Sequence, residues 1–190
     1  MGKKVGLTLD DVIASAAAIA DRDGLEAMSL RAVADDLGIK TPSLYNHVGG
    51  LAGLRRELAL YGARHLTQVV AAARGDGDPA DKVRRSAQAY RRFALDHQGL
   101  YQAMFPAPRP GEDDELYEAM GDPVSDLAAI LIDAGVEDRE TVHVIRALRA
   151  VVHGFIDLEM KDGFGMPEAV DVSFEKAVDV VIQGVLVEAK

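Results

Sequence analysis

The apolar positions of this 190-residue chain recur with a helical period along most of its length. Between Leu9 and Ala20 they form one stripe, and Thr8 and Asp11 ahead of it have the spacing of a capping box. No stretch shows the alternation of a half-buried strand, so the pattern predicts an all-α protein. The expected helices span residues 8–23, 29–37, 41–48, 51–74, 79–97, 99–105, 114–134, 139–161 and 173–188.

The second and third of these helices are short and separated by a tight turn. Ser29 is suited to cap the first of the pair, and Gly38 stands where that helix has to end in a left-handed conformation. Thr41 is expected to cap the next helix, with Pro42 at its first position, where the missing N–H costs nothing. This arrangement is typical of a helix-turn-helix, whose second helix enters the major groove of DNA.

The outward face of the helix at residues 41–48 is polar. Leu44 and Val48 are expected to face the core. The remaining side chains offer hydroxyls, an amide, an imidazole and an aromatic edge, and belong to Ser43, Tyr45, Asn46 and His47. A short helix with this face is suited to contact a polar partner.

Residues 8–60 resemble the DNA-binding domain of the TetR family of transcriptional regulators. The matching pieces are Asp23-Gly24-Leu25, Met28–Ala34 and Thr41–Val48. The resemblance implies that base edges are contacted by Arg31, Thr41, Ser43 and Asn46. It also implies phosphate contacts from Lys40, Tyr45 and His47, with an apolar contact from Pro42. The partner would be double-stranded operator DNA, and most members of this family are repressors.

The last two helices carry more apolar positions than one stripe needs. Val144, Val151 and Leu158 widen the apolar face of the segment 139–161. A helix that is apolar on more than one side has to bury both sides. The resemblance implies that these helices pair with their copies in a homodimer. We therefore expect an N-terminal three-helix helix-turn-helix DNA-binding domain in residues 1–50. Residues 51–190 are expected to form a C-terminal helical bundle for ligand binding and dimerisation.

The charge distribution restricts where DNA can bind. A net charge of −10 disfavours a general nucleic-acid binder. Residues 1–60, however, hold seven Lys/Arg against eight Asp/Glu, whereas residues 61–190 hold fourteen against twenty-three. Residues 37–56 contain no acid and three basic residues, which are Lys40, Arg55 and Arg56.

One position departs from the family pattern. Where the family commonly has a phosphate-binding Lys at the start of the next helix, this chain has Leu51. We therefore expect either a lower operator affinity or a shift of the phosphate contact onto Arg55 and Arg56. Lys3 and Lys4 form either a basic arm for DNA or a solvated tail.

The C-terminal helices also contain polar and soft side chains within otherwise apolar stretches. The polar ones are Tyr90, His97, Tyr101, Tyr117, His143, Arg146 and His153. The soft ones are Met104, Phe105, Met120 and Phe155. All of these except His153 form the predicted site for a small-molecule effector, which the resemblance implies. The alternative is that they are core or solvent-facing side chains without a ligand.

Other chemistries find no support in the sequence. The absence of Cys excludes disulfides and thiolate catalysis, and the five His show no metal-ligand spacing. No nucleophile–base pair, cofactor motif or membrane-length apolar run is present, so we expect a cytoplasmic protein that is not an enzyme. The alternative function is a helical interaction or small-molecule-binding protein whose helix-turn-helix does not bind DNA.

Overall fold

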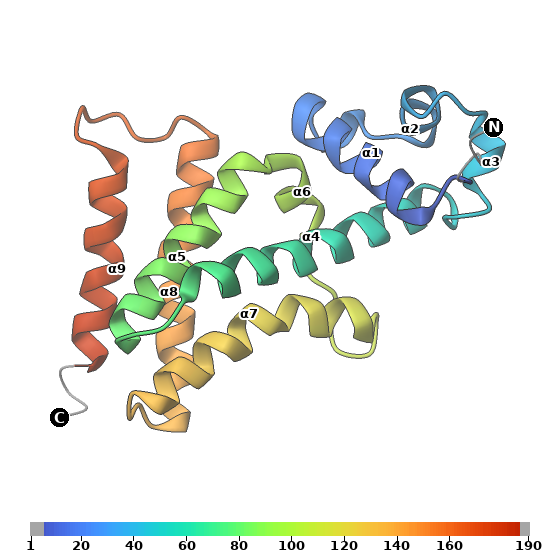
Figure 1. The fold of residues 1–190 in the computed structure, drawn as a ribbon. Helices are drawn as coiled ribbons and strands as arrows, with labels where there is room; N and C mark the ends of the chain where they lie inside the picture. The colour runs from blue at the N-terminus through green and yellow to red at the C-terminus, as the bar shows by residue number, and fades with distance from the viewer. Residues whose placement is uncertain (1–5, 187–190) are drawn as a thin grey trace. The chain divides into compact units, whose positions relative to one another are not determined.

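The computed structural model describes residues 6–186, and within that range every regular element is helical (Figure 1). This confirms the all-α prediction. Lys3 and Lys4, the candidate basic arm, lie outside the described residues. The elements in chain order are α1 (Leu9–Asp23), the short 3-10 helix η1 (Leu25–Ala27), α2 (Leu30–Asp36), α3 (Thr41–Leu44), α4 (Gly50–Arg74), α5 (Pro79–Asp96), α6 (Gln98–Ala103), α7 (Asp114–Asp133), α8 (Asp138–Met160) and α9 (Val170–Leu186).

These helices pack into two compact units. The first comprises residues 6–64 and 97–117, and the second comprises residues 65–96 and 118–186. The sequence analysis placed a domain boundary at residue 50. The packing changes within α4, after Arg64, so α4 contributes residues to both units.

The first unit is organised around α1. Thr8 Oγ1 accepts a hydrogen bond from the Asp11 N–H at 3.2 Å, and the Asp11 carboxylate accepts one from the Thr8 N–H at 2.9 Å. The predicted capping box is therefore confirmed, and the hydrogen bonds from Thr8 lower the pKa of Asp11. The buried Ser15 donates a hydrogen bond of 2.6 Å to Asp36 and joins α1 to α2. The fully buried side chains of this unit include Val12, Met28, Val33, Leu44, Leu54 and Leu58.

The backbone of α6 lies directly against α1. A Cβ added at Gly99 would lie 2.0 Å from the Ala20 carbonyl oxygen, so only glycine fits at this position. Asp21 fixes the contact from the side. Its carboxylate accepts a hydrogen bond of 2.9 Å from the Leu100 N–H and lies 2.9 Å from His97 Nδ1.

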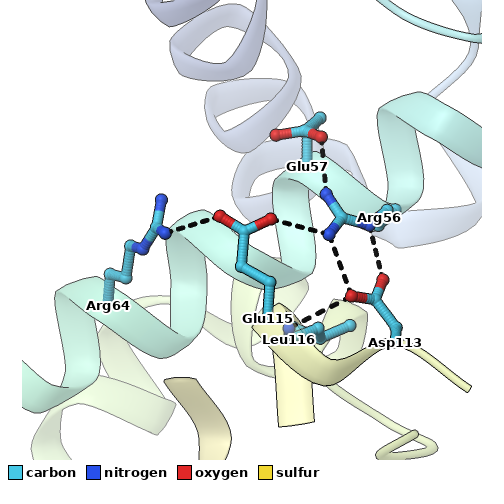
Figure 2. Close-up of polar contacts among 6 residues, drawn as sticks. All are labelled: Arg56, Glu57, Arg64, Asp113, Glu115 and Leu116. Carbon is cyan, nitrogen blue, oxygen red and sulfur yellow. Dashed lines mark hydrogen bonds and ion pairs between the residues drawn. The ribbon is translucent and has the colours of Figure 1, made fainter. Parts of the chain in front are cut away.

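A cluster of charged side chains joins α4 to the start of α7 within the first unit (Figure 2). Arg56 donates hydrogen bonds to Asp113, to Glu115 at 2.8 Å and to Glu57 at 2.8 Å, and Glu115 also accepts one from Arg64 at 2.8 Å. The hydrogen bonds from Arg56 hold the pKa values of Asp113 and Glu115 below their usual range. Arg56 is therefore occupied by three carboxylates, and the structure does not support its expected phosphate contact.

The second unit is built on α5, α8 and α9, which pack against one another pairwise (Figure 1). Its core includes the fully buried Phe174 and Ile156. Arg91 is held between the three helices with only 12 % of its side chain exposed. It contacts Glu159 at 2.6 Å and Asp171 at 2.8 Å, and its guanidinium lies 4.9 Å from the centre of the Phe174 ring. A buried arginine requires this degree of pairing.

Two expectations about helix ends need correction. Lys40, not Thr41, is the N-cap of α3, because the Ser43 N–H already bonds to the Lys40 carbonyl oxygen at 2.8 Å. The regular part of α3 ends at Leu44, and residues 45–47 continue as turns. The last helix begins at Val170, three residues before the expected position.

The close approach at Gly99 should make this position intolerant of any side chain. We expect Gly99→Ala to lower the free energy of unfolding by about 2–3 kcal/mol, because α6 has to move away from the Ala20 carbonyl. Gly121→Ala is the matched control, since a Cβ there meets no atom within 4 Å, and we expect it to be neutral or stabilising by up to about 1 kcal/mol. Urea unfolding followed by circular dichroism measures both. Equal stability of the two variants would contradict the close contact.

The two neighbouring arginines of α4 should differ in their effect on stability. Arg56→Ala removes the centre of the charged cluster, and we expect a loss of about 1–2 kcal/mol. Arg55 lies 3.9 Å from Glu26, both side chains being well exposed, so Arg55→Ala should change the stability by less than about 0.5 kcal/mol. Thermal unfolding in low salt distinguishes the two variants. A larger loss for Arg55→Ala would refute this assignment.

Candidate functional site

The turn between α2 and α3 sets the position of the short outer helix. Ser29 Oγ accepts a hydrogen bond of 3.1 Å from the Ala32 N–H and begins α2, as predicted. Gly38 adopts a positive φ of 64°, and the Ile39 N–H bonds back to the Ala34 carbonyl oxygen at 2.9 Å. These local bonds reverse the chain and start α3 one residue after Lys40.

Two buried side chains anchor the segment from α3 to residue 48. Leu44 and Val48 are 0 % and 4 % exposed, which confirms that they face the core. The Val48 N–H bonds to the Leu44 carbonyl oxygen at 3.0 Å and keeps the two residues one turn apart. The opposite side of this segment is left for solvent or a partner.

The side chains predicted to contact DNA lie on that opposite side. Tyr45 is 62 % exposed. Lys40, Pro42 and Asn46 are also exposed, and Thr41, Ser43 and His47 are half-buried. Among residues 6–186, none of the polar side chains in this group has an intramolecular hydrogen-bond partner. Exposed donors and acceptors without internal partners remain available to a polar ligand.

Arg31 lies on the first turn of α2. Its side chain is 87 % exposed, and its Nε is 3.6 Å from a carboxylate oxygen of Asp35 one turn later. A solvent-exposed pair of this length contributes little free energy, so the guanidinium can exchange Asp35 for another partner. Leu51, on the first turn of α4, is 37 % exposed and has no charge to offer a phosphate.

A second feature is a cavity of about 70 Å³ within the second unit. Side chains of α4, α5, α7 and α8 form its wall. The apolar lining residues are Val70, Val83, Ala87, Pro123, Leu127, Ile130, Leu148 and Val152. The polar and charged lining residues are Arg74, Ser86, Tyr90, Asp126, Arg149 and His153.

Apart from Arg149, the polar groups of the cavity are uncharged or paired. Arg74 lies 2.9 Å from Asp126. The Tyr90 hydroxyl and His153 Nε2 are 3.5 Å apart. Burial raises the pKa of Tyr90 to about 12, and burial together with Arg149 lowers the pKa of His153. Both groups are therefore neutral at pH 7.

The structure does not gather the predicted ligand residues around this cavity. Of the ten, Tyr90 lines it. Five lie in the first unit, namely His97, Tyr101, Met104, Phe105 and Tyr117. The other four lie in the second unit away from this wall, namely Met120, His143, Arg146 and Phe155.

Several of those residues have a packing role instead. Tyr101 is buried, and its ring lies 5.3 Å from that of Phe105. Phe155 packs between Phe164 and Phe174 at ring-centre distances of 5.2 and 5.3 Å. Most of the lining residues that the sequence analysis missed are small, aliphatic or paired charges, and no local pattern marks them; the exceptions are Arg149 and His153.

The two last helices expose matching lines of small and apolar residues. On α8 these are Ala147, Val151, Gly154 and Leu158, and on α9 they are Ser173, Ala177, Val180 and Gly184. Both lines follow the spacing i, i+4, i+7, i+11 of one helix face. Val180 is 70 % exposed, and a Cβ at either glycine would meet no atom within 4 Å.

None of the helices in residues 6–186 has both the length and the apolar character required to span a lipid bilayer.

Comparison with known proteins places the chain in a family. Residues 83–181 match the family model described as the tetracyclin repressor-like C-terminal domain. The uncharacterized HTH-type transcriptional regulator YobS of Bacillus subtilis is 31 % identical over 192 residues, which cover 100 % of this chain and 98 % of YobS. The HTH-type transcriptional repressor DrrR1 of Streptomyces coeruleorubidus is 53 % identical over 49 residues, which cover 26 % of this chain and 18 % of DrrR1.

Solved structures share the fold. The TetR family protein ActR of Streptomyces coelicolor, in complex with (S)-DNPA, superposes with a TM-score of 0.69 and 22 % identity over 98 % of this chain and 100 % of that chain. The full-length similarity to YobS, an HTH-type regulator, agrees with the helix-turn-helix of α2 and α3, and the family model matches the C-terminal helices. The chain belongs to the TetR family of DNA-binding transcriptional regulators.

Proposed function

We propose that this regulator is a homodimeric repressor that binds a near-palindromic operator through α3 and leaves it when an effector binds in the second unit. The observation that carries the proposal is the outward face of residues 40–47. It is exposed, polar and without internal hydrogen-bond partners among the described residues, yet it is anchored by the buried Leu44 and Val48. Such a face is ready to bind without first breaking contacts of its own.

The division between base and phosphate contacts follows from the chemistry of each side chain. Base edges in the major groove accept hydrogen bonds from guanidinium and amide groups, which suits Arg31 and Asn46, and the hydroxyls of Thr41 and Ser43 are versatile donors and acceptors. Phosphates suit the charge of Lys40 and the exposed polar groups of Tyr45 and His47. Pro42, exposed beside them, is suited to an apolar contact.

Dimerisation is supported by the exposed lines on α8 and α9. Gly154 and Gly184 lie on exposed helix surfaces where nothing within one chain requires a glycine. The close approach of a helix from a second copy would require small residues at these positions. A two-fold dimer places its recognition helices in successive major grooves, about 34–36 Å apart. Operator half-sites separated by one helical turn follow from this geometry.

Effector release requires two states of the dimer that bind the effector with different affinity. A hundredfold preference for the state that does not bind DNA corresponds to about 2.7 kcal/mol, which is enough to empty a marginally occupied operator. α5 contributes Ser86 and Tyr90 to the cavity and continues through His97 into α6, which packs on α1. The complex of ActR with (S)-DNPA supports ligand binding by a protein of this fold.

The experiment that tests the proposal is selection of DNA fragments by the purified protein, followed by sequencing. We expect enrichment of a near-palindrome whose half-site centres lie about 10 base pairs apart. Failure to enrich any sequence, with the protein folded and dimeric, would refute operator binding. It would favour a helical interaction protein whose helix-turn-helix does not bind DNA.

Variants of the α2–α3 face should separate base contacts from phosphate contacts. We expect Arg31→Ala and Asn46→Ala each to weaken operator binding by about 1–3 kcal/mol and to relax base preference. Tyr45→Phe should weaken binding to operator and random DNA equally, because a phosphate contact carries no sequence information. Fluorescence anisotropy on both DNAs at fixed salt measures these effects. Equal losses on both DNAs for all three variants would remove the base-contact assignment.

A charge on the exposed line of α9 should prevent dimerisation. We expect Val180→Asp to shift the protein to monomer, because a carboxylate buried in an apolar interface without a partner costs several kcal/mol. Val142→Asp is the control, since Val142 is an exposed valine of α8 outside the line described above. Sedimentation velocity gives the oligomeric state. A monomeric wild type at micromolar concentration, or a dimeric Val180→Asp, would contradict this interface.

A further inference from the structure

The cavity in the second unit has a wall that is mostly hydrocarbon. Residues from four helices supply it, and Val83 of α5, Ile130 of α7 and Leu148 of α8 among them are buried. An apolar wall favours the hydrocarbon part of a ligand and penalises any charge that has to give up its hydration. The wall therefore selects for low polarity before any hydrogen bond is considered.

The charges around the cavity offer little to a ligand ion. Arg74 and Asp126 are 2.9 Å apart and neutralise each other. Tyr90 and His153 are uncharged at pH 7, for the reasons given above. Arg149, the remaining charged group of the lining, is exposed to solvent, which weakens its charge, although that charge still contributes to lowering the pKa of His153. An ammonium ion would therefore lose hydration without a counter-charge, and a carboxylate would gain only the screened attraction of Arg149.

One polar atom of the wall lacks a partner. Ser86 Oγ is buried and makes no hydrogen bond with any part of the chain that the structure describes. Buried hydroxyl groups are normally satisfied, and an unsatisfied one costs free energy that a ligand can recover. Ser86 and Tyr90 are separated by four residues on α5, so both face the same side of that helix.

The size of the cavity limits the ligand. Its volume of about 70 Å³ is roughly half that of an engineered cavity of about 150 Å³ that binds benzene. A cavity of this size holds a ligand group of a few carbon atoms and one polar atom.

We propose that this cavity binds a compact, neutral, largely hydrocarbon molecule whose single hydroxyl or carbonyl group bonds to Ser86. The assignment of that molecule as the effector rests on the proposed function. The binding of the molecule to the cavity does not depend on that function, and the experiment tests binding and function separately.

The test uses three four-carbon probes of matched length, 1-butanol, butanoate and butylammonium, with the full-length protein. Resonances of Tyr90 and His153 report binding in NMR titrations. We expect saturable chemical-shift changes with 1-butanol. Both ions should bind roughly tenfold more weakly than 1-butanol, or weaker still. Ser86→Ala should weaken 1-butanol binding roughly fivefold to tenfold. Ser125→Ala, at an exposed serine of α7, should leave it unchanged.

Three results would overturn the inference: no saturable shift with 1-butanol, binding of either ion as tight as that of 1-butanol, or equal 1-butanol affinity in wild type and Ser86→Ala. Operator binding is measured in parallel without any probe. If the protein binds no operator while the binding of 1-butanol still depends on Ser86, the proposed ligand class is correct and the proposed function is wrong. If operator binding holds and 1-butanol does not bind, the ligand class fails alone.

Discussion

The direct contact between the backbones of α1 and α6 constrains the first unit more than any side-chain interaction. At Gly99 the helix lies so close to the Ala20 carbonyl that no side-chain atom separates them. Asp21 reinforces the contact by accepting the Leu100 N–H and pairing with His97. Packed backbones adopt discrete arrangements, because a small displacement creates either a clash or a void. The helix-turn-helix, which packs on α1 through α2, therefore depends on where α6 lies.

The arginines of this acidic protein divide into two groups. Arg56 and Arg91 are surrounded by carboxylates and hold helices together, Arg56 between α4 and α7 and Arg91 among α5, α8 and α9. Arg31, in contrast, has within residues 6–186 only a long exposed contact with Asp35. A cation that is already paired has little to gain from a phosphate, since binding would first have to break the existing contacts. Net charge alone conceals this distinction, which decides where an acidic protein can meet DNA.

The sequence predicted those features that depend on neighbours within a few residues. The caps at Thr8 and Ser29, the positive φ of Gly38 and the inward direction of Leu44 are all set by short-range bonds and periodicity. The role of Arg56 could not be predicted, because its partner Asp113 is 57 residues away in the sequence.

The cavity could not be predicted either, because its lining residues are also far apart in the sequence. Its wall combines aliphatic residues of four helices, and no periodic pattern reveals which of them leave a space. Several of the aromatic and Met residues predicted to line a ligand pocket, such as Tyr101, are instead buried in the core.

The outward side chains of α3 and the turn after it carry a consequence for how such a regulator changes over time. They have no hydrogen-bond partners among the described residues, and the segment is held in place by Leu44 and Val48 on its other side. A substitution at Ser43 or Asn46 therefore costs the folded state very little, while it alters what the surface can recognise. Gene duplicates with this architecture can drift toward new target sequences without passing through unfolded intermediates. Substitutions on this face can therefore change DNA recognition while the stability of the fold stays nearly constant.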